Sequence, residues 1–219
     1  MSVDLMNVWS IFIKGGLVMW PLMILSILSI SIIVEKFIVL MHLRNSWFAS
    51  RDKIFVLVEQ AKFKDAADSC DQLPPLMGRT LKSGILKYGS SRESILLVMQ
   101  QAIAVELNEL KKRMSLLACI VNVAPLLGLL ATTIGLTVVF HAVHMRSNAL
   151  NPLSLGDMSS GIWQALVATS TGLGVGIIAF VGHALLAQQM NDLISSLEES
   201  MQAMANMLYS HWEGRDHAR

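Results

Sequence analysis

Residues 116–143 read LLACIVNVAPLLGLLATTIGLTVVFHAV, a stretch without any Asp, Glu, Lys or Arg. About 20 consecutive apolar residues suffice to cross the hydrocarbon core of a bilayer as an α-helix. A surface helix of a soluble protein does not stay apolar over this length, because one of its faces meets water. The stretch therefore predicts a membrane-spanning helix.

Two further stretches, residues 17–40 and 161–187, have the same character. The first carries charge only at Glu35 and Lys36 near its end, where we expect the two side chains to pair or to extend toward the interface. It is too long for the apolar core of a signal peptide, which covers about 7–15 residues, and no small-residue cleavage site follows it. The second carries one ionisable side chain, His183. The three stretches together predict an all-α integral membrane protein with three transmembrane helices.

The composition agrees with a membrane protein, because 53% of the residues are hydrophobic and 15% are charged, against about 25% charged in soluble domains. Lys and Arg number 17 and Asp and Glu 16, so no net charge favours nucleic acid as a partner. Two cysteines, Cys70 and Cys119, are too few for a disulfide framework or an all-cysteine zinc site. No phosphate-binding loop, His/Cys metal motif or nucleophile elbow occurs. We therefore expect no enzyme activity, no cofactor and no metal site.

The basic residues predict the orientation of the spans. Most Lys and Arg residues lie between the first and second spans, whereas only Lys14 precedes the first span and only Arg146 separates the second from the third. Cytoplasmic loops carry the excess of Lys and Arg. The predicted segments are a periplasmic N-terminus (1–16), a cytoplasmic helical loop (41–115), a periplasmic hairpin (144–160) and a cytoplasmic helical tail (188–219). Trp9, Trp20 and Trp163 near the outer ends fit an interfacial aromatic belt.

The segments outside the spans also have helical patterns. Residues 52–60 and 62–70 predict short amphipathic helices, interrupted by the two prolines of residues 73–76. No helix breaker lies between Glu93 and Pro125, so we expect one helix from the loop into the second span, and the third span to continue into the tail. Their apolar stripes, which are typical of packing faces, are Ile95, Val98, Met99, Ala102, Val105 and Leu110 in the loop, and Met190, Leu193, Leu197, Met201, Met204 and Leu208 in the tail.

The second and third spans contain small uncharged polar residues and no carboxylate. These polar residues are Thr132, Thr133, Thr137, Gln164, Thr169, Ser170 and Thr171. Ser and Thr in membrane helices commonly bond to a carbonyl of their own helix, and Gln164 could bond to a neighbouring helix. A proton pathway built from carboxylates is absent from these spans, so an acidic group for proton transfer must come from another chain.

Small residues in the third span predict close helix packing. Gly172, Gly174, Gly176 and Gly182 are expected to form one small face, and the Gly172-x-x-x-Gly176 spacing allows two backbones to approach. Pro125 removes a backbone donor within the second span and is expected to kink it. The candidate packing and kink residues are Pro125, Gly128, Gly135, Gly172 and Gly176.

Motifs in all three spans resemble one protein family. The first span opens with GLVMWPL (16–22) and ends with VEK (34–36), the second carries APLLGLLATTIG (124–135), and the third carries GIWQALVATSTGL (161–173). They resemble the Gly-x-x-Met-x-Pro-Leu start and Glu-Arg exit, the Ala-Pro-x-x-Gly-Leu-x-Gly-Thr-Val-x-Gly motif and the Gly-Ile-x-Glu-Ala-Leu-x-x-Thr-x-x-Gly-Leu motif of the ExbB/TolQ/MotA proton-channel family. The ExbB/TolQ branch fits better, because the flagellar-stator branch typically has four spans.

The resemblance implies an assembly and its partners. It implies a homopentamer of long helices around a central pore, in which an ExbD/TolR-like single-span subunit, as a dimer, supplies a titratable Asp. Proton flow through such a complex in the bacterial inner membrane would drive a TonB- or TolA-like transducer and energise outer-membrane transport or envelope maintenance. Thr132 and Thr169 match the pore-facing threonines of the family near that Asp. Their hydroxyls both donate and accept, so they can order water beside a proton carrier.

Two residues depart from the family pattern: Gln164 stands where many members have Glu, and Ala131 replaces a glycine. Glutamine cannot titrate, so Gln164 is a candidate pore-lining residue to which no proton step is assigned. Two hypotheses stay open. One is a proton-driven stator that relies on the partner's carboxylate, and the other is a nonconducting membrane scaffold that recruits partners through its cytoplasmic helices. A neighbouring gene for a single-span protein with an Asp just inside its span would favour the stator.

Overall fold

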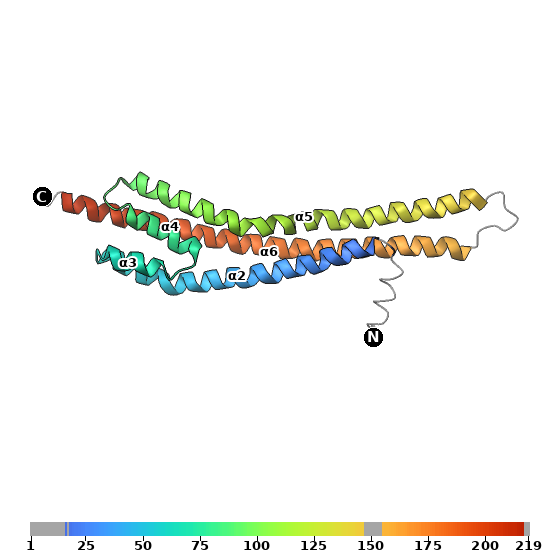
Figure 1. Ribbon diagram of the computed structural model, residues 1–219, viewed down its shortest axis with the longest axis horizontal. Coiled ribbons are helices and arrows are strands. Elements are labelled where there is room, and N and C mark those ends of the chain that lie inside the picture. Colours follow the sequence, from blue (N-terminus) through green and yellow to red (C-terminus); the bar gives the residue numbers. More distant parts are fainter. Residues whose placement is uncertain (1–15, 17, 147–154, 217–219) are drawn as a thin grey trace. The chain divides into compact units, whose positions relative to one another are not determined.

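The computed structural model describes residue 16 and residues 18–146 and 155–216, and every regular element among them is helical (Figure 1). The helices are α2 (Met19–Glu59), α3 (Phe63–Cys70), α4 (Pro75–Leu86), α5 (Arg92–Arg146) and α6 (Leu155–Asp216). The prediction of an all-α fold is therefore confirmed. Trp9, Lys14, nearly all of the predicted N-terminal segment and the middle of the 144–160 hairpin lie outside the described residues.

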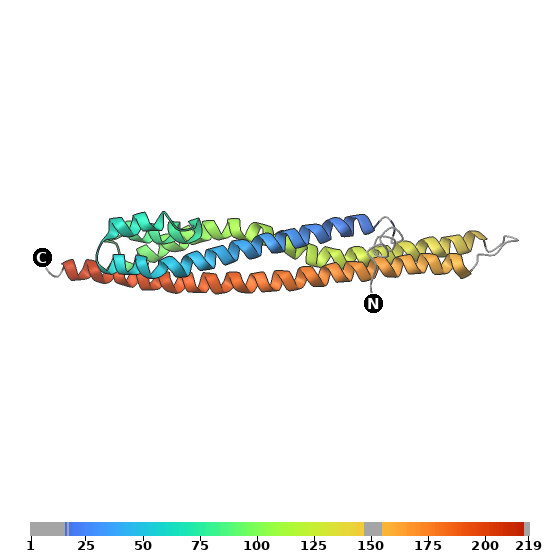
Figure 2. The same cartoon turned by 90° about the horizontal axis from the view of Figure 1, so that it is seen from below.

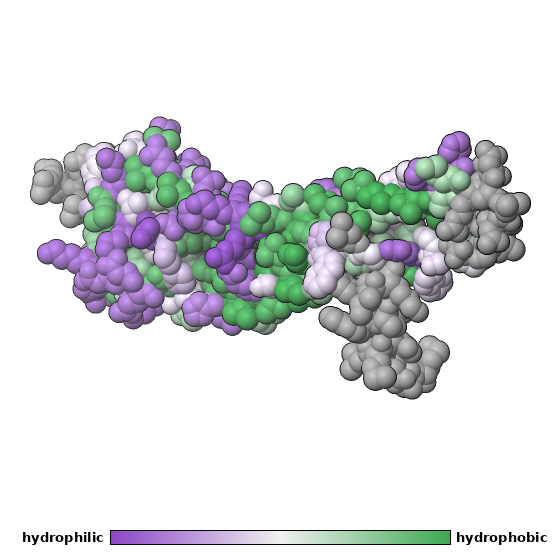
Figure 3. Space-filling model, turned by 45° about the vertical axis from the view of Figure 1, so that its right-hand side comes forward, coloured by the Kyte–Doolittle hydropathy of each residue, from purple (hydrophilic) through white to green (hydrophobic). Residues whose placement is uncertain are grey.

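Three helices, α2, α5 and α6, are long and apolar enough to cross a membrane. Large apolar side chains on them, such as Leu126, Ile177 and Phe180, are exposed, and Figure 3 shows a continuous band of hydrophobic side chains on the surface. Water disfavours so extensive an apolar surface, whereas lipid tails accommodate it. The prediction of three membrane-crossing helices is confirmed.

Each of these three helices continues beyond its apolar stretch without a break. In α5 and α6 this confirms the predicted continuations into the loop and into the tail. In α2 it corrects the prediction of a separate short helix over residues 52–60, because residues 52–59 form the last part of α2. No Gly or Pro occurs between residues 38 and 60, so nothing interrupts the hydrogen-bond ladder of the helix there.

α2 ends in a turn that normally requires glycine. Ala61 has a φ of 56°, in the left-handed region. The Lys62 N–H donates to Leu57 O and the Ala61 N–H donates to Val58 O, each at 3.0 Å. These two bonds are those of a Schellman motif, in which the residue after the helix adopts the left-handed conformation.

The helix predicted over residues 62–70 is found as α3. The proline pair after it ends one helix and also starts another, since α4 begins at Pro75 with the extended Pro74 before it. Proline is favoured at the first helical position, where its missing N–H would be unpaired in any case. α4 packs on α3, so closely that a side chain on Gly78 would overlap the Cys70 carbonyl.

The described chain forms two compact units. The apolar unit comprises the described residues up to 34 together with residues 115–184, and the polar unit comprises residues 35–114 together with residues from 185 onward. In the apolar unit α5 and α6 lie side by side in both views (Figure 2). The long helices contribute residues to both units.

The core of the polar unit is built from large side chains. All six members of the predicted tail stripe on α6 are buried. The stripe predicted on α5 is wrong at Val105, which is 65% exposed, because the buried positions follow the spacing Ile95, Met99, Ile103. Trp47 of α2 is completely buried in this core, and its Nε1–H donates to Ser196 Oγ at 3.2 Å.

Glu35 and Lys36, near the end of the first apolar stretch, do not form an ion pair with each other. Glu35 forms an ion pair with Arg113 of α5. Lys36 is 6% exposed, and its Nζ donates to the Leu110 carbonyl at 2.9 Å. Both side chains therefore tie α2 to one turn of α5 within the polar unit. Of the two outcomes expected for them, mutual pairing is not the one found.

Candidate functional site

The backbones of α5 and α6 touch in the apolar unit at small residues. A Cβ placed on Gly172 would lie 2.8 Å from Ala124 O and 2.9 Å from Gly128 Cα. A Cβ on Gly176 would lie 2.6 Å from Pro125 Cγ. No side chain fits at these positions, so the glycines allow α6 to approach the turn of α5 that contains Pro125.

Thr132 and Thr169 face each other across this contact. Their Oγ1 atoms are 2.5 Å apart. Thr169 Oγ1 also donates to Gly128 O of the opposite helix at 2.8 Å, and Thr132 Oγ1 lies 3.2 Å from the same carbonyl. Both residues are half-buried, so their hydroxyls form a polar pair at an edge of the helix contact.

The hydroxyl pair has fewer protons than acceptors. Thr169 Oγ1 also lies 3.1 Å from Ala165 O, so two hydroxyl protons serve Gly128 O, Ala165 O and each other's oxygens. A hydroxyl has one proton and two lone pairs. Several hydrogen-bond arrangements are therefore possible, and each leaves lone pairs for a water molecule or an external donor. The pair can orient a proton donor, although neither hydroxyl takes up or releases a proton itself at neutral pH.

The other threonines of the spans bond within their own helices. Thr133 donates to Leu130 O at 2.8 Å, Thr137 to Thr133 O at 2.7 Å and Thr171 to Val167 O at 2.9 Å. This is the usual behaviour of threonine in a membrane helix. Thr132 and Thr169 also reach carbonyls of their own helices, but they differ from the other three because they bond across the α5–α6 contact.

Gln164 lies five residues before Thr169 on α6 and has no hydrogen bond to the hydroxyl pair. It is exposed and lines a hollow of 280 Å³, whose walls include Ala131 and Gly135 of α5. The amide lies against Gly16, where a Cβ would overlap it. The structure thus joins Thr132 with Thr169 and places Gln164 beside them in a separate hollow.

The four glycines expected to form one face of the third span do not share one. Gly172 and Gly176 pack against α5, whereas a Cβ on Gly182 would overlap Ile33 of α2 and Gly174 has nothing within 4 Å. The reason is the helical period, because Gly174 lies two residues from Gly172 and Gly176, and Gly182 lies six residues beyond Gly176. Neither separation returns to the same face of the helix.

The sequence reasoning missed Ala124 and Gly161 as parts of this contact. Ala124 supplies the carbonyl next to Gly172, and a Cβ on Gly161 would overlap Val139. A detectable signal was the recurrence of small residues every three to four positions on both helices. They are Ala124, Gly128, Ala131 and Gly135 on α5, and Gly161, Ala165, Ala168, Gly172 and Gly176 on α6.

The described residues contain no cluster of three His, Cys, Asp or Glu side chains that could hold a metal ion. Cys70 and Cys119 are free thiols. Burial, helped by the neighbouring Asp71, raises the pKa of the Cys70 thiol to about 11. Cys70 is therefore protonated at neutral pH and is a poor nucleophile.

Comparison with known proteins agrees with this architecture. Residues 72–199 match the model of the MotA/TolQ/ExbB proton channel family. The chain is 30% identical over 195 residues to the putative biopolymer transport protein ExbB-like 1 of Synechocystis, a match that covers 82% of this chain and 72% of that protein. It is 26% identical over 193 residues to the biopolymer transport protein exbB1 of Vibrio cholerae, covering 85% and 82% of the two chains. With its three membrane-crossing helices, the chain belongs to the MotA/TolQ/ExbB proton channel family and is ExbB-like within it.

Proposed function

We propose that this chain is the channel-forming stator subunit of a proton-driven motor in the bacterial inner membrane. The observation that carries the proposal is the Thr132–Thr169 hydroxyl pair, held at 2.5 Å where α5 and α6 meet. Both helices lack carboxylates in their apolar stretches, so the pair is suited to orienting a titratable group from another chain.

In the proposed complex, five copies surround a pore and an ExbD/TolR-like single-span subunit, as a dimer, supplies an Asp. When that Asp comes level with a hydroxyl pair, the pair accepts a hydrogen bond from the protonated acid or donates one to the carboxylate. Threonine serves both protonation states of the Asp without a charge of its own. Gln164 lines the adjoining hollow and orders water there as a neutral donor and acceptor.

The work done by proton flow would pass to a TonB- or TolA-like transducer, and so to outer-membrane transport or envelope maintenance. The distribution of Lys and Arg supports a cytoplasmic polar unit and a periplasmic N-terminus. Proton flow would then move the partner relative to the ring of five copies, and the long helices of the polar unit would anchor that ring.

Proton flux into liposomes tests the proposal. The chain is reconstituted with its single-span partner, with the partner's Asp intact or replaced by Asn. We expect flux only with the partner and its Asp, and we expect Thr132→Val and Thr169→Val each to reduce it at least about tenfold, as the loss of a hydrogen bond to a charged group would. Thr133→Val is the matched control, because that hydroxyl bonds only within its own helix.

Full flux in both threonine variants would overturn the assignment of the hydroxyl pair. An intact complex that conducts no protons in any combination would favour the second hypothesis, a nonconducting scaffold. The observation behind that alternative is Gln164, an amide that cannot titrate at a position where many family members carry Glu.

A further inference from the structure

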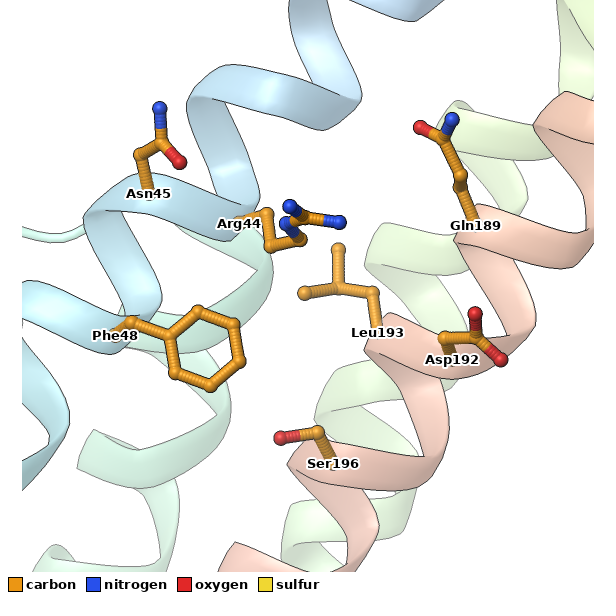
Figure 4. A pocket seen from close by; sticks show the side chains of 7 residues that line it. All are labelled: Arg44, Asn45, Phe48, Gln189, Asp192, Leu193 and Ser196. Atoms are coloured by element: carbon orange, nitrogen blue, oxygen red, sulfur yellow. The ribbon is translucent and has the colours of Figure 1, made fainter.

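A groove runs between α2 and α6 in the polar unit (Figure 4). It consists of two hollows of 410 and 180 Å³ that share Arg44, Gln189 and Leu193 as lining residues. Its α2 wall begins at Phe37, in the last turn of the first apolar stretch, and its α6 wall begins at Gln189, just beyond the third. The groove therefore lies on the parts of both helices that leave the hydrocarbon core at the level of the lipid headgroups.

Two opposite charges line the groove, and neither is paired with another residue that the structure describes. Arg44 extends from α2 toward α6 in Figure 4, and Asp192 lies on the α6 wall. Both side chains are exposed, and neither forms an ion pair with another described residue. A hollow with one free cation and one free anion is complementary to a zwitterion.

Uncharged polar atoms lie near these charges. Ser196 Oγ accepts the Trp47 Nε1–H at 3.2 Å, so the Ser196 proton is available to an acceptor in the groove. Gln189 and Asn45 add one amide to each wall. The polar part of the groove thus offers hydrogen-bond donors for a phosphate beside acceptors for an ammonium group.

The α2 wall of the groove is apolar apart from Arg44 and Asn45. Phe37, Met41 and Phe48 line it, and they are 43%, 49% and 59% exposed. Together with Arg44 these residues are spaced by four, three and four positions, so they form one stripe of the helix. The end of the stripe nearest the apolar stretch is apolar and the cation follows it, as expected for a molecule with a tail and a charged head.

We propose that this groove binds a phospholipid with a zwitterionic headgroup that carries a primary ammonium, as in phosphatidylethanolamine. The Arg44 guanidinium donates to the phosphate, with Ser196 as a second donor, and the ammonium donates to the Asp192 carboxylate. The acyl chains lie along Phe37 and Met41. The larger hollow, 410 Å³, is within the range of about 300–1,000 Å³ that is usual for small-molecule sites.

Native mass spectrometry of the full-length chain tests the proposal. The chain is exchanged from detergent into an equimolar mixture of phosphatidylethanolamine, phosphatidylcholine and phosphatidylglycerol, and the retained lipids are counted. We expect phosphatidylethanolamine to be retained preferentially. Arg44→Gln should lower the retention of all three lipids about tenfold, because each has a phosphate. Asp192→Asn should abolish the preference for ethanolamine over choline, which has no N–H to donate.

Arg51→Gln and Glu199→Gln are the matched controls, since both residues are charged, lie on the same two helices and do not line the groove. They should leave retention and preference unchanged. Equal retention of the three lipids by the unmodified chain would overturn the proposal. Groove variants that change the number of subunits without changing lipid retention would also overturn it, and would identify the groove as a contact between copies of the chain.

Discussion

Helices pack differently inside the apolar unit and inside the polar unit, although the same three helices contribute to both. In the apolar unit, α5 and α6 touch through backbone atoms at Gly128 and Gly172, and large side chains such as Phe180 point outward. In the polar unit, large side chains point inward, with Trp47 and Met99 completely buried.

The difference reflects the two surroundings. Lipid tails are as apolar as leucine, so burying a large side chain in a membrane gains little, and helices associate through close van der Waals contact and hydrogen bonds. In water, each buried Å² of apolar surface contributes about 25 cal/mol. A helix that continues from lipid into water must therefore change from small to large residues on its packing face.

Replacing a large buried residue should have the greatest effect, and it should be confined to the polar unit. Trp47→Ala removes the largest buried side chain and leaves a cavity, which typically costs about 3–5 kcal/mol. We expect hydrogen exchange of residues 45–59 and 190–208 to accelerate in the detergent-solubilised chain, while exchange in residues 120–140 stays unchanged.

Ser196→Ala serves as the control for Trp47→Ala, because it removes only the hydrogen bond of the indole and should cost about 1 kcal/mol. Equal acceleration of exchange in both units would show that they do not differ in their packing as described.

A large residue in place of a contact glycine should have the second-largest effect, in the apolar unit. Gly172→Leu forces a side chain against Ala124 O and Gly128 Cα, and because these are backbone atoms, the helices must separate. Overpacking of this kind costs about 3 kcal/mol. The melting temperature in a detergent that disperses the chain into monomers should fall accordingly.

Gly174→Leu is the matched control on the same helix, since nothing lies within 4 Å of Gly174. Its melting temperature should stay close to that of the unmodified chain. A similar decrease for both variants would mean that leucine perturbs α6 itself and that the α5–α6 contact is not the cause.

Much of the fold follows from the sequence alone, because uninterrupted apolar stretches and the lack of breakers determine where long helices run. The continuity of α5 and α6 was predictable for that reason. The helix at 52–60 was misassigned as separate, although no Gly or Pro divides it from the first span. Helix α4 was not anticipated, because a proline pair both ends and starts helices.

It is harder to predict which face of a helix is buried than to predict how long the helix is. Val105 fits a plausible stripe, yet Ile103 is the buried residue. Likewise, periodicity does not distinguish Thr132 from Thr133 as the threonine that faces α6, and the family resemblance was needed for that choice. The meeting of Thr132 with Thr169 at Gly128 O depends on the angle and register between two helices, which one sequence does not specify.

Glycine should also be the favoured residue at a left-handed turn, for a conformational reason instead of the steric one that applies at the α5–α6 contact, and the smallest predicted effect tests this. Ala61 holds a left-handed φ of 56° at the end of α2, a conformation that is strained for any residue with a Cβ. Ala61→Gly relieves the strain and should stabilise the polar unit by about 0.5–1 kcal/mol, after the entropy that glycine loses on folding. Chemical denaturation followed by tryptophan fluorescence measures the gain.

Gly89→Ala is the mirror experiment, because Gly89 has a φ of 89° and a Cβ there would meet only Trp212, at 3.8 Å. Its loss of stability would come from backbone conformation alone, so a gain from Gly89→Ala, or a loss from Ala61→Gly, would contradict the assignment of strain to these turns.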